Sequence, residues 1–159
     1  MNTNEAMQHY FSNLVGWLEL CASDRGVTSI SFIEEPSEPV PKSAHPMMKK
    51  LAEELDGYFS GKLTIFSIPV ALTVGSPFQR RVWKQLALIP YGETRSYADI
   101  ARNVGNPLGS RAVGGANGSN PVPIIVPCHR VIKADGSIGG FSSGVHIKRK
   151  LLALEGVVL

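Results

Sequence analysis

Residues 120–131 read NPVPIIVPCHRV, and this segment is the most informative part of the chain. Three prolines interrupt an apolar run. Because proline lacks a backbone N–H and fixes φ, we predict a stiff, non-helical segment that leads to Cys128. The neighbouring His129 and Arg130 are expected to help stabilise a thiolate, which a nucleophilic cysteine requires. Taken alone, a cysteine is more often a small buried hydrophobic residue, and Cys21 is predicted to be one.

Upstream of that segment, helical signals begin at residue 76. Ser76 followed by Pro77 is typical of a helix N-terminus, and apolar residues then recur at helical spacing as far as Ile89. The composition also changes at this point. We therefore place a domain boundary near residue 74, with one domain over residues 1–74 and a second over residues 75–159.

Two shorter helices are predicted over residues 97–104 and 111–117, with Ser96 and Ser110 as their N-caps and a turn at 105–107 between them. Such a pair resembles a helix-turn-helix. Glycine and alanine give the second helix little side-chain bulk on one side. It can therefore approach closely either a DNA groove or a neighbouring helix, and this stretch alone slightly favours packing against a helix.

The N-terminal part of the chain predicts a small α/β structure. Residues 14–21 are apolar-rich and residues 27–33 alternate with period two, so both are predicted as strands. The turn residues at 23–26 join them into a hairpin. A helix is predicted from Met47 to near Gly61, and one more strand over residues 63–70.

Charge is divided unevenly along the 159 residues. Residues 1–76 carry five Lys/Arg and nine Asp/Glu, a net charge of −4, whereas residues 77–159 carry eleven and four, a net charge of +7. A basic half of this kind favours a polyanionic partner, although a solvated basic face has the same pattern. The hydrophobic content of 43% predicts a folded core.

No run of about 18 to 20 apolar residues predicts a membrane span, and the N-terminus lacks the features of a signal peptide. We therefore expect a cytoplasmic protein in a reducing compartment, with free thiols at Cys21 and Cys128.

The motif Pro-Cys-His-Arg-Val at residues 127–131 resembles the signature of the O6-alkylguanine-DNA alkyltransferase family. Residues 77–156 are similar to the whole catalytic and DNA-binding domain of that family, with 111–117 as its recognition helix and 151–156 as its closing helix. Residues 1–75 look like its N-terminal domain. The resemblance implies a ribonuclease-H-like α/β N-terminal domain with a small sheet and a helix. A mainly α C-terminal domain follows, with a winged-helix-like helix-turn-helix.

The resemblance also implies a reaction. Cys128 takes the alkyl group from O6-alkylguanine in DNA, and is expected to take it from O4-alkylthymine as well, in a stoichiometric step that inactivates the protein. His129 acts as the base through a water, and Glu155 holds the imidazole in the right tautomer. Asn120 braces the turn that carries Cys128. Without the resemblance, Glu155 is more simply interpreted as a surface charge at a helix end.

The damaged base is expected to flip into a pocket, with Arg111 filling its place in the stack. Tyr97, otherwise interpreted as a core aromatic residue, donates to guanine N3. The Cys128 and Val131 carbonyls accept from the exocyclic amine, and the Ser142 N–H donates to O6. Phe141 and Ser143 stand where many relatives have tyrosine and glycine, which puts the tolerance for larger alkyl groups in doubt. The residues expected to bind DNA are Arg111, Ala112, Gly114, Gly115, Ala116 and Asn117.

No cofactor is implied, because the DNA itself donates the alkyl group. No metal is expected, since Cys21, His9 and His45 have no recognisable ligand spacing. The predicted partner is double-stranded DNA carrying O6-alkylguanine, bound by a monomer, and cooperative assembly on DNA is left open. The short chain favours a prokaryotic source, with the protein at the nucleoid when bound.

Three other functions compete with this one. A helix-turn-helix regulator would protect specific undamaged sequences, but a recognition helix of alanine and glycine has few side chains that read bases. A cysteine hydrolase using Cys128 and His129 would turn over an ester or amide. A damage-binding relative without repair activity would lack the acceptor cysteine, so Cys128 argues against it.

Overall fold

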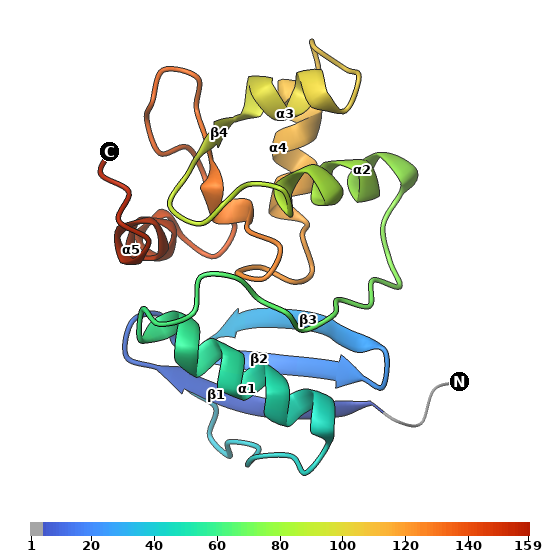
Figure 1. The fold of residues 1–159 in the computed structure, drawn as a ribbon, viewed down its shortest axis with the longest axis vertical. Helices are drawn as coiled ribbons and strands as arrows, with labels where there is room; N and C mark the ends of the chain where they lie inside the picture. The colour runs from blue at the N-terminus through green and yellow to red at the C-terminus, as the bar shows by residue number, and fades with distance from the viewer. Residues whose placement is uncertain (1–4) are drawn as a thin grey trace. The chain divides into compact units, whose positions relative to one another are not determined.

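The structure is a computed structural model that describes residues 5–159, and the chain forms two compact units, Met1–Thr73 and Val74–Leu159 (Figure 1). The elements of the first unit are β1 (Ala6–Ser12), β2 (Gly16–Ser23), β3 (Gly26–Ile33) and α1 (Pro46–Phe59). Those of the second unit are α2 (Pro77–Leu86), β4 (Arg95–Ser96), α3 (Tyr97–Asn103), α4 (Ser110–Gly118), the 3₁₀ helix η1 (Cys128–Arg130), β5 (Val131–Ile132) and α5 (Val145–Leu154).

In the first unit, β1, β2 and β3 form an antiparallel sheet in that order, and α1 packs across one face of it (Figure 1). Leu18 and Leu20 of the central strand are fully buried, as are Leu51 and Leu55 of the helix. These apolar faces follow period two in the strand and period 3.6 in the helix, and their mutual burial holds the unit together. Gly26 has φ +148°, and a Cβ at this position would lie 2.4 Å from the Pro69 carbonyl oxygen, so the turn between β2 and β3 requires glycine.

The predicted hairpin of the first unit is confirmed, but the sheet contains a strand that the pattern did not indicate. β1 is hard to recognise because two of its inward positions are polar, Gln8 and Ser12. The buried Gln8 side chain accepts a hydrogen bond from the Ser43 N–H (2.8 Å), which satisfies it inside the fold.

The strand predicted over residues 63–70 is wrong, except for one parallel bridge between Val70 and Val27. Here the Glu54 carboxylate accepts hydrogen bonds from the backbone N–H groups of Ser67 and Ile68, so these groups are not available to pair with a strand. Pro69 has no N–H to offer.

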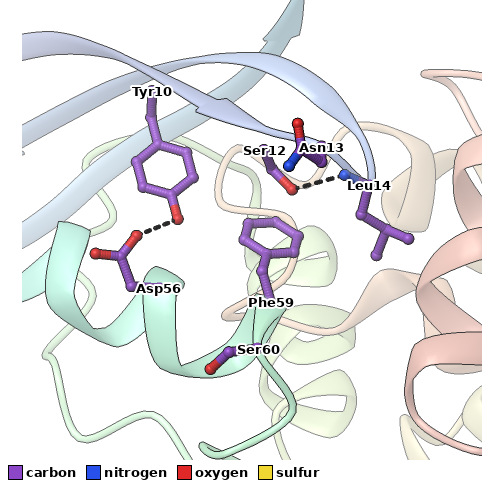
Figure 2. A pocket seen from close by; sticks show the side chains of 7 residues that line it. All are labelled: Tyr10, Ser12, Asn13, Leu14, Asp56, Phe59 and Ser60. Carbon is purple, nitrogen blue, oxygen red and sulfur yellow. Dashed lines mark hydrogen bonds between the residues drawn. The ribbon is translucent and has the colours of Figure 1, made fainter.

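A shallow hollow of about 470 Å³ lies where the end of β1 faces the last turn of α1 (Figure 2). The Tyr10 hydroxyl donates to Asp56 at 2.6 Å, and burial together with this carboxylate raises the pKa of Tyr10. Phe59 stacks on Tyr10 with ring centroids 6.0 Å apart. These contacts tie the strand to the helix.

The helices of the second unit begin largely where their capping residues predict. Ser76 and Ser96 each accept a hydrogen bond from the N3 backbone N–H and form capping boxes with Gln79 and Asp99. Ser110 differs from the prediction, because it is the first residue of α4 and Gly109 is the N-cap, without a side-chain hydrogen bond. The helices α2, α3 and α4 pack against one another (Figure 1).

The proline-rich segment before Cys128 is non-helical, as predicted, and runs through turns from residue 119 to residue 127. Ile124 within it has φ +75°, a strained conformation for a β-branched residue, and its side chain is buried. After η1, β5 pairs in parallel with β4 over two residues. The predicted helix pair is present as α3 and α4. The winged part of the prediction would need a β-hairpin, and residues 74–159 contain none. In residues 5–159, no helix has the length and apolar character needed to cross a membrane.

Candidate active site

Cys128 opens η1, directly after the proline-rich segment, and only 4% of its surface is exposed. Burial raises the pKa of its thiol to about 11, against the opposing effects of the Asn120 amide and the Lys148 ammonium. The resting group is therefore a protonated thiol at neutral pH. Chemistry at this sulfur requires a base that removes the proton.

His129 is fully buried beside it, and its Nε2 atom lies 2.6 Å from Glu155 Oε2. Burial lowers the pKa of His129 although Glu155 opposes the shift, so the imidazole is neutral. Because a carboxylate only accepts hydrogen bonds, the proton resides on Nε2. The Nδ1 lone pair is then the basic position. This atom is buried and has no hydrogen-bond partner among residues 5–159.

The Glu155 carboxylate is held by a cluster of donors. It is the C-cap of α5 and is almost fully buried. Arg130 donates from Nε to Oε1 (2.8 Å) and from Nη2 to Oε2 (3.1 Å), and the Gly92 N–H donates to Oε1 (3.1 Å). The third guanidinium nitrogen, Nη1, donates to the Ile89 carbonyl at 2.7 Å. Glu155 is thus kept as a charged acceptor in a fixed orientation.

The expectation that Arg130 stabilises a Cys128 thiolate is wrong. The guanidinium is occupied by Glu155 and Ile89, and its carbon lies 5.7 Å from the centroid of the Tyr91 ring. Adjacent side chains in a 3₁₀ turn point in different directions, which sequence proximity does not reveal.

Lys148 is a member of the site that the sequence did not single out. Its side chain is fully buried in α5, and Nζ donates to the carbonyls of Val131 (2.6 Å) and Gly140 (3.0 Å). Burial lowers the pKa of Lys148 to about 8, with Cys128 opposing the shift. The signal available was a lysine on the apolar face of an amphipathic helix, between Ile147 and Leu151.

The loop that presents Cys128 is braced by the side chain of Asn120. Its Nδ2 donates to the Val126 carbonyl (2.7 Å), and its Oδ1 accepts from the Val122 N–H (3.0 Å). Both contacts close the proline-rich turn onto itself. They hold the backbone that leads into Cys128.

A cavity of about 450 Å³, within the size range of small-molecule sites, is lined by residues that contact this cluster, since Gly140 accepts from Lys148 and Asn117 donates to the Cys128 carbonyl. Tyr97 lines it, and burial, together with Cys128, raises the pKa of its hydroxyl, which therefore stays protonated. The other lining residues are Gly114, Asn117, Gly118, Gly140, Phe141 and Ser142. Gly139 has φ +74°, and a Cβ there would lie 3.1 Å from the Tyr97 hydroxyl, so a larger residue would crowd that ring.

The residues expected on the DNA-facing side of α4 divide into two groups. Arg111, Ala112 and Gly115 are exposed, and Gly114 is half-buried at the cavity. Ala116 and Asn117 are buried at 3% and 5% exposure. Their side chains face the protein, so the surface that α4 offers to DNA is narrower than the sequence suggested.

Two family profiles match the chain. The 6-O-methylguanine DNA methyltransferase DNA binding domain matches residues 77–157, and the ribonuclease-like domain of the same methyltransferase matches residues 7–72. The chain belongs to the 6-O-methylguanine DNA methyltransferase family. The resemblance noted at residues 127–131 is thereby confirmed.

Relatives in this family match over most of their length. A methylated-DNA–protein-cysteine methyltransferase of Methanosarcina acetivorans is 43% identical over 92% of this chain and 96% of its own. Its counterpart in Mycolicibacterium paratuberculosis is 46% identical over 89% of this chain and 87% of its own length. The crystal structure of Mycobacterium tuberculosis OGT in complex with DNA is 43% identical, covers 94% of this chain and 91% of its own, and has a TM-score of 0.84.

Proposed function

We propose that this protein repairs alkylated DNA directly, by transferring the alkyl group of O6-alkylguanine irreversibly to Cys128. The observation that carries the proposal is the buried thiol next to a neutral imidazole whose far nitrogen is paired with a clamped carboxylate. Family membership supplies the reaction. It is a methylated-DNA–protein-cysteine methyltransferase that acts once, because water does not cleave the thioether product.

In the proposed step, Cys128 Sγ bonds to the alkyl carbon while the bond from that carbon to guanine O6 breaks, and guanine leaves with the electron pair. The thiol proton passes to His129 Nδ1 through a bridging water. Glu155 fixes the tautomer and stabilises the imidazolium that forms, as a carboxylate does in a catalytic triad. Asn120 acts as a positioning residue for the turn.

Base recognition is proposed at the cavity beside Cys128. Tyr97 donates to guanine N3, and its raised pKa keeps the hydroxyl protonated for that purpose. The Ser142 N–H donates to O6, and the Val131 carbonyl accepts from the exocyclic amine. Phe141 forms part of the wall. We extend the substrate range to O4-alkylthymine as a second substrate.

DNA binding is proposed for the domain over residues 75–159, through the helix-turn-helix formed by α3 and α4. Arg111 fills the place of the flipped base, and Ala112, Gly114 and Gly115 form the surface that approaches the groove. The absence of bulk at Gly115, where a Cβ would meet no atom within 4 Å, suits close approach. We propose that residues 1–74 form a ribonuclease-H-like domain, and that a monomer acts in the cytoplasm at the nucleoid.

The test is mass spectrometry after incubation with an excess of duplex DNA carrying O6-methylguanine. Trypsin separates the two cysteines, because Cys128 lies in the peptide of residues 112–130 and Cys21 lies before Arg25. We expect one methyl group per protein, on the 112–130 peptide. A Cys128→Ser variant should take none, and a matched Cys21→Ser variant should react like the wild type.

A folded protein that acquires no methyl group would contradict the proposal. Methylation that continues beyond one equivalent per protein would contradict the single-turnover reaction. Repeated hydrolysis of an ester or amide at Cys128 would instead favour the cysteine hydrolase.

A further inference from the structure

Asn117 lies near the C-terminal end of α4, where its side chain is 95% buried and faces the segment that carries the nucleophile. Its Nδ2 donates to the Cys128 carbonyl at 3.2 Å. A carbonyl oxygen only accepts hydrogen bonds, so this contact fixes the orientation of the amide. The Oδ1 atom is therefore directed away from the Cys128 carbonyl.

That Oδ1 atom is buried and has no hydrogen-bond donor among the residues that the structure describes. Buried polar atoms nearly always have a partner, and leaving one unpaired costs free energy. Asn117 also lines the 450 Å³ cavity, so one residue contacts both the cavity and the Cys128 backbone. An unpaired acceptor on a residue that lines a cavity is suited to a bound ligand that supplies a donor.

The chemistry of the proposed substrate identifies that donor. The ring nitrogens N1, N3 and N7 of an O6-alkylguanine are acceptors, and its two N–H groups belong to the exocyclic amine at C2. The Val131 carbonyl holds one donor, Lys148 at 2.6 Å, and keeps a second lone pair for one of these N–H groups, while the Cys128 carbonyl is held by Asn117 itself at 3.2 Å. Oδ1 has both lone pairs available.

We propose that Asn117 reads the exocyclic amine of the flipped guanine, with Oδ1 accepting one of its N–H groups while Nδ2 holds the Cys128 carbonyl. This inference rests on the proposed function and adds a specificity residue to it. A base without the amine, such as O6-alkylhypoxanthine, loses the contact. A site built to bond a substrate N–H discriminates against an analogue that lacks it.

The experiment compares two duplexes that differ only in this amine, one with O6-methylguanine and one with O6-methylhypoxanthine. Single-turnover rate constants at limiting protein concentration are measured for the wild type and for Asn117→Leu, which has similar size and no polar atoms. We expect Asn117→Leu to slow O6-methylguanine about tenfold more than O6-methylhypoxanthine, equivalent to about 1.4 kcal/mol.

Two control variants distinguish a direct contact with the amine from a general effect of a substitution on the structure. Asn120→Ala removes a brace that does not touch the amine, so it should slow both duplexes by the same factor. Asn13→Leu, at an exposed position between β1 and β2 in the first unit, should change neither rate. Where Asn117→Leu does not fold, as judged by circular dichroism, Asn117→Ser makes the same comparison, because its hydroxyl is too short to serve both partners.

Equal loss on both duplexes in the Asn117 variant would overturn the inference and leave Asn117 as a packing residue. Failure of the proposed function has a different signature, in which the wild-type protein transfers no methyl group from either duplex to Cys128.

Discussion

Replacing Glu155 by glutamine tests the proton path with little change of shape. Each Glu155 oxygen accepts two hydrogen bonds, Oε1 from Gly92 and Arg130 Nε, and Oε2 from His129 and Arg130 Nη2. The amide nitrogen of glutamine must face one of these pairs. Oε1 faces two permanent donors, Gly92 N–H and Arg130 Nε–H, whereas Oε2 faces one, Arg130 Nη2, together with His129, which can exchange tautomers. The amide nitrogen is therefore expected on the side of His129.

In that arrangement the imidazole accepts at Nε2 and carries its proton on Nδ1, the position that must receive the thiol proton. Loss of a positioned general base costs about 10² to 10⁴ in rate. Stability falls as well, because Arg130 is buried and loses its counter-ion, a change that costs about 3–5 kcal/mol in comparable buried pairs. The two effects are measured separately.

The assay is the single-turnover transfer rate on O6-methylguanine duplex, with urea unfolding monitored by circular dichroism to correct for the folded fraction. Glu93→Gln is the matched control, since Glu93 is exposed and pairs with Arg95 at 3.1 Å on the surface of the same unit. It should change the rate little and the stability by less than about 1 kcal/mol. A folded Glu155→Gln protein that transfers methyl groups at the wild-type rate would refute the proton path.

Three further outcomes are expected. Because burial lowers the pKa of His129 below 6.5, the imidazole stays neutral in mild acid, and the transfer rate should hold as pH falls to 6.5; a decline that begins at higher pH would contradict this. Arg111→Ala should slow transfer from duplex DNA but not from free O6-benzylguanine. Arg102 is a matched exposed arginine on α3, and Arg102→Ala should slow transfer from DNA less. An equal loss of rate on DNA and on the free base would show that Arg111 acts in packing. Burial lowers the pKa of Lys148 from 10.5 to about 8, so the unfolded chain binds more protons between these values, and the free energy of unfolding should rise with pH across that window; Lys148→Met should reduce the rise, and an unchanged pH dependence would argue against a buried ammonium.

The parts of the fold that the sequence predicts are those set by local chemistry. Ser76 and Ser96 mark helix starts because a capping hydrogen bond spans only three residues. β1 was missed because Gln8 is satisfied by Ser43, a partner 35 residues away. The predicted strand over residues 63–70 failed because Glu54 on α1 takes its N–H groups.

In the site, too, residues defined by a local motif could be predicted, whereas residues whose role depends on a distant partner could not. The motif identifies Cys128 and His129, and the resemblance adds Glu155, which the structure places 2.6 Å from the imidazole. Arg130 could not be assigned correctly, because its partner lies 25 residues later in the chain. Lys148 required knowledge that α5 buries this face against the Val131 carbonyl.

The charges of the site explain how a cysteine with a raised pKa can still react. At rest, the buried charges are Glu155, Arg130 and the Lys148 ammonium, while Cys128 and His129 are neutral. Moving the thiol proton to His129 leaves the net charge unchanged. The imidazolium then adjoins the carboxylate at 2.6 Å, and the new thiolate is favoured by the lysine that already lowers the pKa of Cys128. Burial protects the thiol against adventitious reaction, and the paired charges reduce the cost of ionisation when an alkylated base is in place.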